Sequence, residues 1–250
     1  MNPTIETILN HRSIRQFTDE KITPQTLELI LKAAYNGSTT GNMQLYSIIV
    51  TQDKERMKEM APFHFNQPIA TNAPLILTFC ADFNRFNKFC LHRDANTKAY
   101  SNMQSYHWAV IDAVIAAQNA CVAAESLGLG LCWLGTITYN MDKFIEILKL
   151  PQHVIPIACI AFGYPVNMPE LTDKLSFEAF VHQEYYHDYD KEDIDRIYKE
   201  KEENPNTLKL YAENGMSNLA KIFTEKRYCQ KDNEYFAQIL VNVLKEQGFL

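Results

Sequence analysis

The chain has 250 residues, of which 46% are apolar, and a formal net charge of −6 at pH 7. A chain of this length buries a large core without disulfides or metals, and its acidic balance excludes a general binder of nucleic-acid backbones, which needs a broad positive field. The six cysteines form no CxxC pair and several stand in apolar runs, so we expect reduced, buried thiols in a soluble cytoplasmic protein.

The first half of the chain alternates helix signals with short apolar strands. The pair Asn2–Pro3 predicts a helix cap and a first helical position, with the helix ending near residue 10. The pair Thr23–Pro24 repeats this signal for a second helix, which we expect to stop at Gly37. Composition then predicts a β-branched strand at 46–51, a charged surface helix at 53–60 and a buried strand at 74–83.

The second half contains one unusually apolar helix. Residues 105–127 are Ala-rich, lack proline and glycine, and predict a helix that is either the central core helix or a subunit interface. The uneven alternation of elements, with no Gly/Ser linker, predicts one domain of α+β or three-layer type with a C-terminal extension. The other elements that we expect are a strand at 131–135, a helix at 141–150, a strand at 155–165, charged helical segments at 191–203 and 218–228, and an amphipathic helix at 234–247.

Several familiar motifs are incomplete or missing. The segment 91–96 is like a kinase catalytic loop but lacks its partner motifs, and Gly-Leu-Gly at 128–130 lacks the strand–turn–helix order of a dinucleotide fingerprint. The histidines show no metal-binding spacing and no serine stands in a nucleophile elbow, so we predict no metal site and no catalytic side chain of these kinds. Four prolines interrupt the longest uncharged stretch, 150–169, so we also predict no membrane helix.

The segment HRSIRQF, residues 11–17, gathers positive charge in an acidic chain. It is either a solvated loop whose arginines form surface ion pairs or a site for one small anion. In an extended segment, His11, Ser13 and Arg15 would share one side and Arg12 and Ile14 the other. A hydroxyl beside guanidinium groups supplies the charge, bidentate geometry and short donor that a phosphomonoester requires. We therefore favour the anion site.

Together with later segments, this cluster resembles a known family. HRSIRQF is followed by DEKI, AAYNGSTTGNMQ, FCADFNR, ESLGLGLCWLG and LKLPQHVIPIACIAFGYP, in that order. The set resembles the FMN-dependent nitroreductases, most of all the oxygen-insensitive NADPH nitroreductase and flavin reductase branch (group A), over residues 4–175. The resemblance implies an α+β three-layer fold, a central mostly antiparallel sheet flanked by helices, and an intertwined homodimer. It also implies one domain over 1–250, with an FMN-binding core at 1–175 and a C-terminal helical extension at 176–250.

The resemblance also implies which residues hold FMN. The basic segment would grip the phosphate and ribityl chain, and a small polar stretch would reach the flavin from the partner subunit. A glutamine after the next turn would meet the polar edge of the flavin, and backbone N–H groups after a strand would face its N5 atom, which accepts hydride. Carried onto this chain, the cofactor-binding residues are His11, Arg12, Ser13, Arg15, Ser38, Thr39, Thr40, Gln44, Gln67, Leu134, Gly135, Thr136 and Lys174. We expect Trp133 to lie in the core instead.

The chain departs from the family pattern at three places. Two basic residues usually follow the last strand, but here Thr172 stands at the first position and only Lys174 supplies charge, without the fork of an arginine. Asn42 replaces a residue that is often aromatic, which predicts a more polar substrate pocket. Residues 199–211 contain lysines but no arginine pair, so the choice between NADPH and NADH stays open.

The implied activity is electron transfer through a flavin. A reduced nicotinamide would reduce bound FMN, and the same open face would then reduce nitroaromatic, quinone or flavin acceptors in a ping-pong cycle. The flavin would supply the chemistry, so no side chain need act as an essential acid or base. Two alternatives remain: an FMN carrier or sensor without significant turnover, and a structural dimer that has lost the flavin. We expect residues 176–250 to cover the flavin edge and the partner subunit.

Overall fold

The computed structural model describes residues 2–250 and divides into two compact units. The larger unit holds the described residues up to Glu170 together with Phe236–Leu250, and the smaller unit is Leu171–Tyr235. All the predicted site residues except Lys174 therefore belong to the larger unit. The predicted organisation as a single domain stays a prediction.

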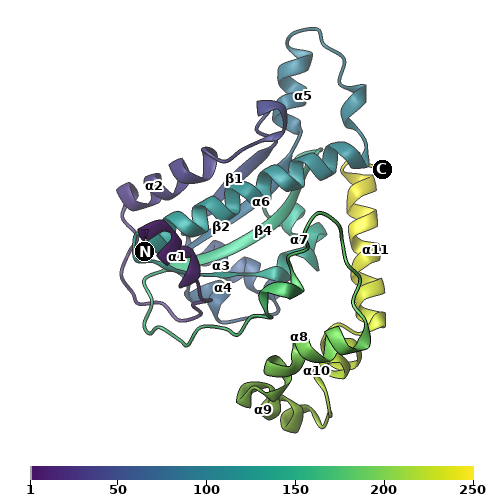
Figure 1. The fold of residues 1–250 in the computed structure, drawn as a ribbon. Helices are drawn as coiled ribbons and strands as arrows, with labels where there is room; N and C mark the ends of the chain where they lie inside the picture. Colours follow the sequence, from purple (N-terminus) through teal and green to yellow (C-terminus); the bar gives the residue numbers. More distant parts are fainter. Residues whose placement is uncertain (1) are drawn as a thin grey trace. The chain divides into compact units, whose positions relative to one another are not determined.

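A four-stranded sheet forms the centre of the larger unit (Figure 1). Its spatial order is β1-β2-β4-β3, and all three strand pairings are antiparallel. Every residue of β2 and nearly every residue of β4 is buried, which explains why their sequences are continuous apolar runs without alternation. The strands are β1 (Tyr46–Thr51), β2 (Leu75–Asp82), β3 (Gly130–Trp133) and β4 (Val154–Gly163).

Helices cover both faces of this sheet. On one face, Leu75, Leu77 and Phe79 of β2 pack with the alanines of α6 (Met103–Ser126) and with α2 (Pro24–Tyr35). On the other face, Ile76 packs with residues of α3 (Lys54–Met60), α4 (Ile69–Asn72) and α7 (Met141–Ile147). Figure 1 shows α6 crossing one side of the strands with α3 and α4 behind them. The predicted three-layer α+β fold is confirmed.

Helix α6 packs against both the sheet and α2 in the core of the larger unit. Asn102 caps it by accepting from the backbone N–H of Ser105, and its small side chains allow close contact with α2 and the sheet. Within residues 2–250, only α6 is long and apolar enough to span a membrane, but 44% of its most apolar window is buried inside the protein. The same helix buries one acidic residue, Asp112, which is 1% exposed.

Local signals fix the helix starts that the sequence predicts. The Asn2 side chain accepts from the N–H of Thr4 at 2.9 Å, and α1 (Pro3–Leu9) follows. The Thr23 side chain accepts from the N–H of Thr26 at 3.1 Å at the start of α2. The short 3₁₀ turns of the larger unit are η1 (Thr40–Asn42), η2 (Ala61–His64), η3 (Lys98–Tyr100) and η4 (Gly135–Thr138).

Helix α4 and helix α5 (Asn84–Leu91) have no counterpart among the elements that the sequence predicts. Helix α5 and the chain up to Asn102 extend away from the sheet (Figure 1). Beside them, Phe249 is fully buried among the rings of Phe83, Tyr106 and His153. The end of α11 (Gln230–Glu246) is thereby anchored at the start of α6.

The smaller unit is helical. Asp190 and Asp193 form a capping box at the start of α8 (Lys191–Glu203), and Arg196 binds the Glu178 carboxylate with two nitrogens. The predicted helix at 191–203 is confirmed, whereas the segment predicted at 218–228 is a short α-helix that continues as a π-helix. The other elements of this unit are η5 (Phe177–Ala179), α9 (Pro205–Asn214), α10 (Leu219–Lys221) and the π-helix Ile222–Arg227.

Candidate functional site

The basic segment 11–17 is bound to the edge of the sheet. The backbone N–H of Ile14 donates to the carbonyl of Leu131 in β3 at 2.8 Å, and Ser13 forms an isolated parallel bridge with Leu131. Further along, the N–H of Thr18 donates to the carbonyl of Tyr164 at 2.8 Å. The segment is therefore a strap along β3 and not the solvated loop that we considered as an alternative.

Gly130 makes this strap possible. A Cβ atom built at Gly130 would lie 2.7 Å from the Cβ and 2.9 Å from the Cγ2 of Ile14, closer than van der Waals contact allows. Ile14 is 2% exposed and cannot move away without shifting the strap. The glycine thus sets the distance between the basic segment and β3.

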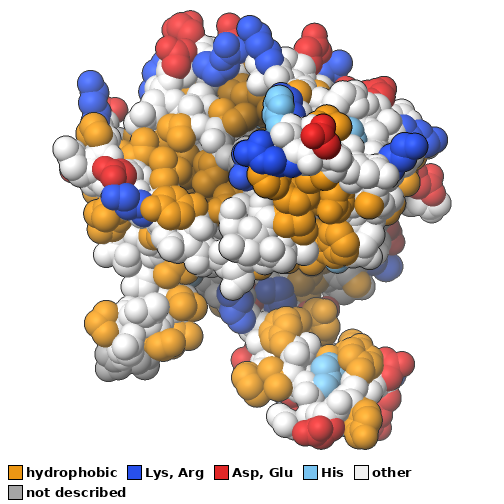
Figure 2. All heavy atoms as spheres, turned by 90° about the horizontal axis from the view of Figure 1, so that it is seen from above, with side chains coloured by type: hydrophobic (Ala, Val, Ile, Leu, Met, Phe, Trp, Pro, Cys, Tyr) orange, Lys and Arg blue, Asp and Glu red, His pale blue; other side chains and the backbone are white. Residues whose placement is uncertain are grey.

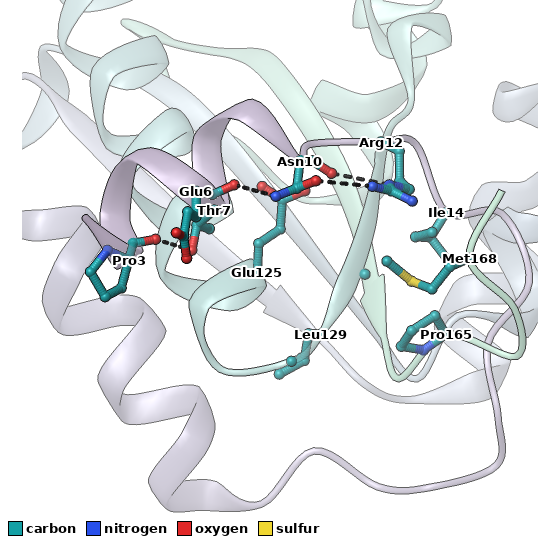
Figure 3. Close-up of a pocket in the computed structure, with 12 residues that line it drawn as sticks. Pro3, Glu6, Thr7, Asn10, Arg12, Ile14, Glu125, Leu129, Pro165 and Met168 are labelled. Atoms are coloured by element: carbon teal, nitrogen blue, oxygen red, sulfur yellow. Dashed lines mark hydrogen bonds between the residues drawn. The ribbon is translucent and has the colours of Figure 1, made fainter. Parts of the chain in front are cut away.

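The two arginines of the strap have different surroundings. Arg12 donates to the carbonyls of Asn10 and Pro169, both at 3.1 Å, and with Ile14 it lines a cavity of about 380 Å³ (Figure 3). Arg15 is exposed and forms no hydrogen bond or ion pair with any residue that the structure describes. Burial raises the pKa of the Cys132 thiol, and the nearby Arg15 guanidinium acts in the opposite direction. Arg15 is therefore the guanidinium available to an anion at the end of β3.

The other polar groups of the strap are also positioned. The Nδ1 atom of His11 lies 2.7 Å from the Glu125 carboxylate at the end of α6, which fixes the imidazole ring. Neither His11, Ser13 nor Arg15 lines the cavity of Figure 3, whereas Arg12 and Ile14 do. This division matches the alternation that the sequence predicts.

Two further predicted segments lie side by side. Turn η2 is followed by Phe65 and Asn66, both with left-handed backbone angles (φ 54° and 53°), and then by Gln67, which is exposed. The Nδ1 atom of His64 lies 2.7 Å from the Thr136 hydroxyl oxygen at the start of η4. The structure therefore brings the turn that carries Gln67 against residues 134–136.

The backbone after β3 is open to a ligand. A Cβ built at Gly135 would meet no atom within 4 Å. The first N–H groups of a helical turn have no partner inside the turn, and no backbone hydrogen bond outside η4 engages those of Gly135 and Thr136 in the described chain. The N–H of Leu134 differs, because it donates to the carbonyl of Cys159 at 2.7 Å. Gly135 and Thr136 are thus the backbone donors that remain available.

The small polar loop 38–44 is pinned to the middle of α6. One Asp112 carboxylate oxygen accepts from the N–H (2.8 Å) and the hydroxyl (3.0 Å) of Thr40, and the other accepts from the N–H of Leu45 at 3.0 Å. Gln44 has a left-handed backbone and donates to the carbonyl of Asn42 at 2.7 Å. Ser38 is exposed and Thr39 is half-buried. The described hydrogen bonds join this loop to α6 and, through Arg85 donating to the Gln44 carbonyl, to α5, but not to the basic strap.

The remaining expectations concern Lys174, Thr172 and Trp133. Lys174 and Thr172 are exposed residues of the smaller unit, and their part in cofactor binding stays a prediction. The expected core position of Trp133 is wrong, because its side chain is 38% exposed. Trp133 is the last residue of β3, an edge strand, and it follows three buried residues at the point where the strand leaves the core.

Sequence reasoning missed three polar residues that organise the site: His64, Asp112 and Glu125. Each acts through a partner distant in sequence, so no local motif announces it. Asp112 did carry a signal, since a lone carboxylate in an otherwise apolar helix has to find hydrogen-bond donors. No group of three or more His, Cys, Asp or Glu side chains in residues 2–250 is arranged to hold a metal ion.

Comparison with known proteins places this geometry in context. The profile of the Nitroreductase family matches residues 8–164. An FMN reductase (NADPH) from Bacillus subtilis is 38% identical over 187 residues, covering 74% of this chain and 75% of that protein. An oxygen-insensitive NADPH nitroreductase from Salmonella typhimurium is 38% identical over 191 residues, covering 76% and 78%. A crystal structure of a Bacteroides fragilis protein superposes with a TM-score of 0.96 at 44% identity, covering 98% of this chain and 99% of that one.

Proposed function

Because this chain belongs to the nitroreductase family, we propose that it is an FMN-dependent oxidoreductase that moves electrons from NADPH or NADH through bound FMN to nitroaromatic, quinone or flavin acceptors. The curated relatives described above are named as an NADPH-dependent FMN reductase and an NADPH nitroreductase. Their similarity covers about three quarters of the chain, and the family match over residues 8–164 includes every candidate site residue of the larger unit.

The observation that carries this proposal is the donor set along β3. Arg15 offers an unpaired guanidinium two residues after Ser13 on the strap, and Gly135 and Thr136 offer free N–H groups after the strand. FMN carries a phosphate dianion at one end and a flavin that accepts hydride at the other, so a charged fork and neutral donors suit its two ends. The residues present therefore fit the cofactor.

Each part of the site then has a role of its own. Arg15 and Ser13 would hold the phosphate, and Glu125 fixes the ring of His11 on the same strap. Gln67 would present its exposed carboxamide to the polar edge of the flavin. For Lys174 we keep the proposal, made from the sequence alone, that it supplies a second positive charge. When bound, FMN supplies hydride acceptance and two-electron transfer. The chain supplies orientation and donors, and a single open face serves the electron donor and acceptor in turn, which is a ping-pong scheme.

We extend the proposal to a homodimer whose interface includes α6. Ile111 and Val114 of α6 are exposed apolar residues, and Ile5, Ile8 and Leu9 of α1 are exposed as well. Figure 2 shows orange side chains gathered in patches on the larger unit, and contiguous apolar patches mark interaction surfaces. The loop 38–44, held on α6, would then reach the partner's flavin. Light scattering tests this directly: a dimer has twice the chain mass of 28.9 kDa, and a species of 28.9 kDa would contradict it.

Localisation and partners complete the proposal. We place the protein in the cytoplasm, acting on small molecules without a nucleic-acid or membrane partner. All six cysteines are free thiols, and five of them are buried. Free thiols of this kind persist in a reducing compartment, and the net charge of −6 gives nucleic acid no general field to bind.

Steady-state kinetics test the proposed activity. The rate of NADPH oxidation is measured at several fixed concentrations of a nitroaromatic and of a quinone acceptor. The ping-pong scheme predicts parallel double-reciprocal lines and product formation that matches the NADPH consumed. A protein that keeps FMN but shows no acceptor-dependent turnover would be a carrier or sensor, and the proposed activity would be wrong.

A further inference from the structure

His11 and Glu125 are joined by a hydrogen bond between the basic strap and the end of α6. The Nδ1 atom of His11 lies 2.7 Å from a Glu125 carboxylate oxygen, and the two side chains are 39% and 13% exposed. The Nε2 atom of His11 forms no hydrogen bond with any residue that the structure describes. Of the two ring nitrogens, Nε2 is therefore the one that a ligand can reach.

The position of His11 along the strap puts its ring on the side of the proposed phosphate donors. Ser13 forms a parallel bridge with Leu131 of β3, and in an extended segment every second side chain points the same way. The side chains of His11, Ser13 and Arg15 therefore share one side of the strap. Figure 3 shows Arg12 and Ile14 lining the cavity on the other side. A phosphate held by Ser13 and Arg15 accordingly lies on the side that carries the imidazole.

The hydrogen bond to Glu125 decides what Nε2 can do. A carboxylate only accepts hydrogen bonds, so Nδ1 carries the proton that the two groups share. A neutral imidazole has a single N–H, and Nε2 is then a bare lone pair that can only accept. The oxygens of a phosphate dianion also only accept. His11 can therefore bind phosphate through Nε2 only after it has taken up a second proton.

The charged groups around His11 come from three elements. Glu125 belongs to α6, Arg12 and Arg15 belong to the strap itself, and Glu6 of α1 lines the same cavity as Glu125 and Arg12. In the described part of the chain, only Glu125 lies within ion-pair distance of the His11 ring. Glu125 is therefore the group that sets which ring nitrogen is protonated first.

We propose that binding of the FMN phosphate is coupled to the uptake of one proton by His11, and that Glu125 is the positioning residue that imposes this coupling. The role of the phosphate rests on the proposed function, whereas the tautomer of His11 is a property of the protein alone. Once it has taken up the proton, the imidazolium donates to Glu125 through Nδ1 and to the phosphate through Nε2. Without the carboxylate, a neutral imidazole can place its single N–H on Nε2 and bind the phosphate with no proton uptake.

The pH dependence of FMN affinity separates this role from a structural one. Flavin fluorescence quenching gives the Kd between about pH 7.5 and 8.5, where a phosphate monoester stays a dianion. In the unmodified protein we expect the Kd to rise with pH by up to about tenfold per pH unit, the limit for one linked proton. In Glu125→Gln we expect the Kd to stay nearly constant over the same range. An equal pH dependence in the two proteins would overturn the inference.

Glu28→Gln is the matched control for the loss of a negative charge. Glu28 is an exposed carboxylate of α2 that pairs with Lys32 and does not contact the strap. We expect this variant to keep the pH dependence of the unmodified protein. A Glu28→Gln protein whose FMN affinity also stopped depending on pH would show that net charge, and not the hydrogen bond to His11, causes the effect.

Nitrogen-15 NMR of His11 reports the protonation states without relying on FMN. At about pH 8.5, where an ordinary imidazole is neutral, we expect Nδ1–H and a bare Nε2 in the ligand-free protein, and an N–H at both positions once FMN or inorganic phosphate is bound. An Nε2–H tautomer in the ligand-free protein, or no second N–H after either addition, would overturn the inference.

These measurements decide the inference even if one of them fails. If Glu125→Gln does not fold, the NMR spectra and the pH dependence of the unmodified protein support or overturn it. If the unmodified protein binds no FMN, the proposed function fails. The spectra with inorganic phosphate alone then decide, because a second N–H on His11 supports the coupling and an unchanged spectrum contradicts it.

Discussion

Replacing Gly130 by alanine should both destabilise the protein and weaken cofactor binding. The new Cβ would lie 2.7 Å from the Cβ and 2.9 Å from the Cγ2 of Ile14, against about 3.5–4.0 Å for carbon atoms in contact. A shift of about 1 Å is therefore required. A change of rotamer cannot provide it, because the Ile14 Cβ is fixed to the backbone of the strap.

The cost follows from these contacts. Overpacking of this kind costs about 1–3 kcal/mol, and moving the strap weakens the 2.8 Å hydrogen bond from the Ile14 N–H to Leu131, which is worth about 1 kcal/mol more. We expect the free energy of unfolding to fall by about 2–4 kcal/mol. FMN affinity should fall with it, because Ser13 and Arg15 belong to the displaced strap.

Urea unfolding followed by circular dichroism measures the stability, and quenching of FMN fluorescence measures the affinity. Gly135→Ala is the matched control for stability, since its Cβ meets nothing within 4 Å. That variant should unfold within about 1 kcal/mol of the unmodified protein. A Gly130→Ala protein with unchanged stability and FMN affinity would refute the close packing of the strap on β3.

Three other changes have distinct expected outcomes. Arg15→Ala should weaken FMN binding by about 10–100-fold with little loss of stability, because it removes a charged donor that has no partner within the described protein. Arg12→Ala should mainly reduce stability, because Arg12 donates hydrogen bonds to two backbone carbonyls. Equal FMN affinities for the two variants would contradict these separate roles of the two arginines. Asp112→Asn should lower the free energy of unfolding by about 1–3 kcal/mol, because the new NH₂ group would face the N–H of Leu45, so that two donors meet where a carboxylate oxygen now accepts. Faster hydrogen exchange in the loop 38–44 should accompany this loss. Between pH 7 and pH 4, the free energy of unfolding should fall by about 3 kcal/mol more in the unmodified protein than in His64→Asn. The reason is that the imidazole of the unfolded chain (pKa about 6.5) takes up a proton that the buried imidazole of the folded chain (pKa about 4) excludes. If urea unfolding gives the same dependence of the free energy of unfolding on pH for both proteins, His64 is not held neutral.

The sequence predicts those elements whose local signals agree with their surroundings. β1 begins and ends where its β-branched composition indicates, and α1 and α2 begin at their Asn-Pro and Thr-Pro pairs. Helix α5 was missed because its N-cap residue is Phe83, whose side chain cannot accept a hydrogen bond; Asp82, the last residue of β2, accepts from the N–H of Arg85 instead. Helix α9 was missed although Asn204 and Pro205 give the same kind of start signal as α1.

The candidate site divides in a similar way. The binding residues of the strap could be predicted from the basic cluster 11–17 alone, and the alternation of their side chains between two sides follows from an extended backbone. The contacts that position them could not be named, because Glu125, Asp112 and His64 meet their partners only once the sheet and α6 are assembled. The exposure of Trp133 depends in the same way on β3 being an edge strand, which no local pattern reveals.

The central claim is that this chain passes electrons from a nicotinamide through FMN held at the basic strap. The most direct measurement is the visible spectrum of the purified protein, titrated anaerobically with NADPH and then with NADH. The account predicts flavin absorption bands that bleach with at least one reductant and return when an acceptor is added. Bands that do not bleach, or no bound flavin even after FMN is supplied, would contradict it.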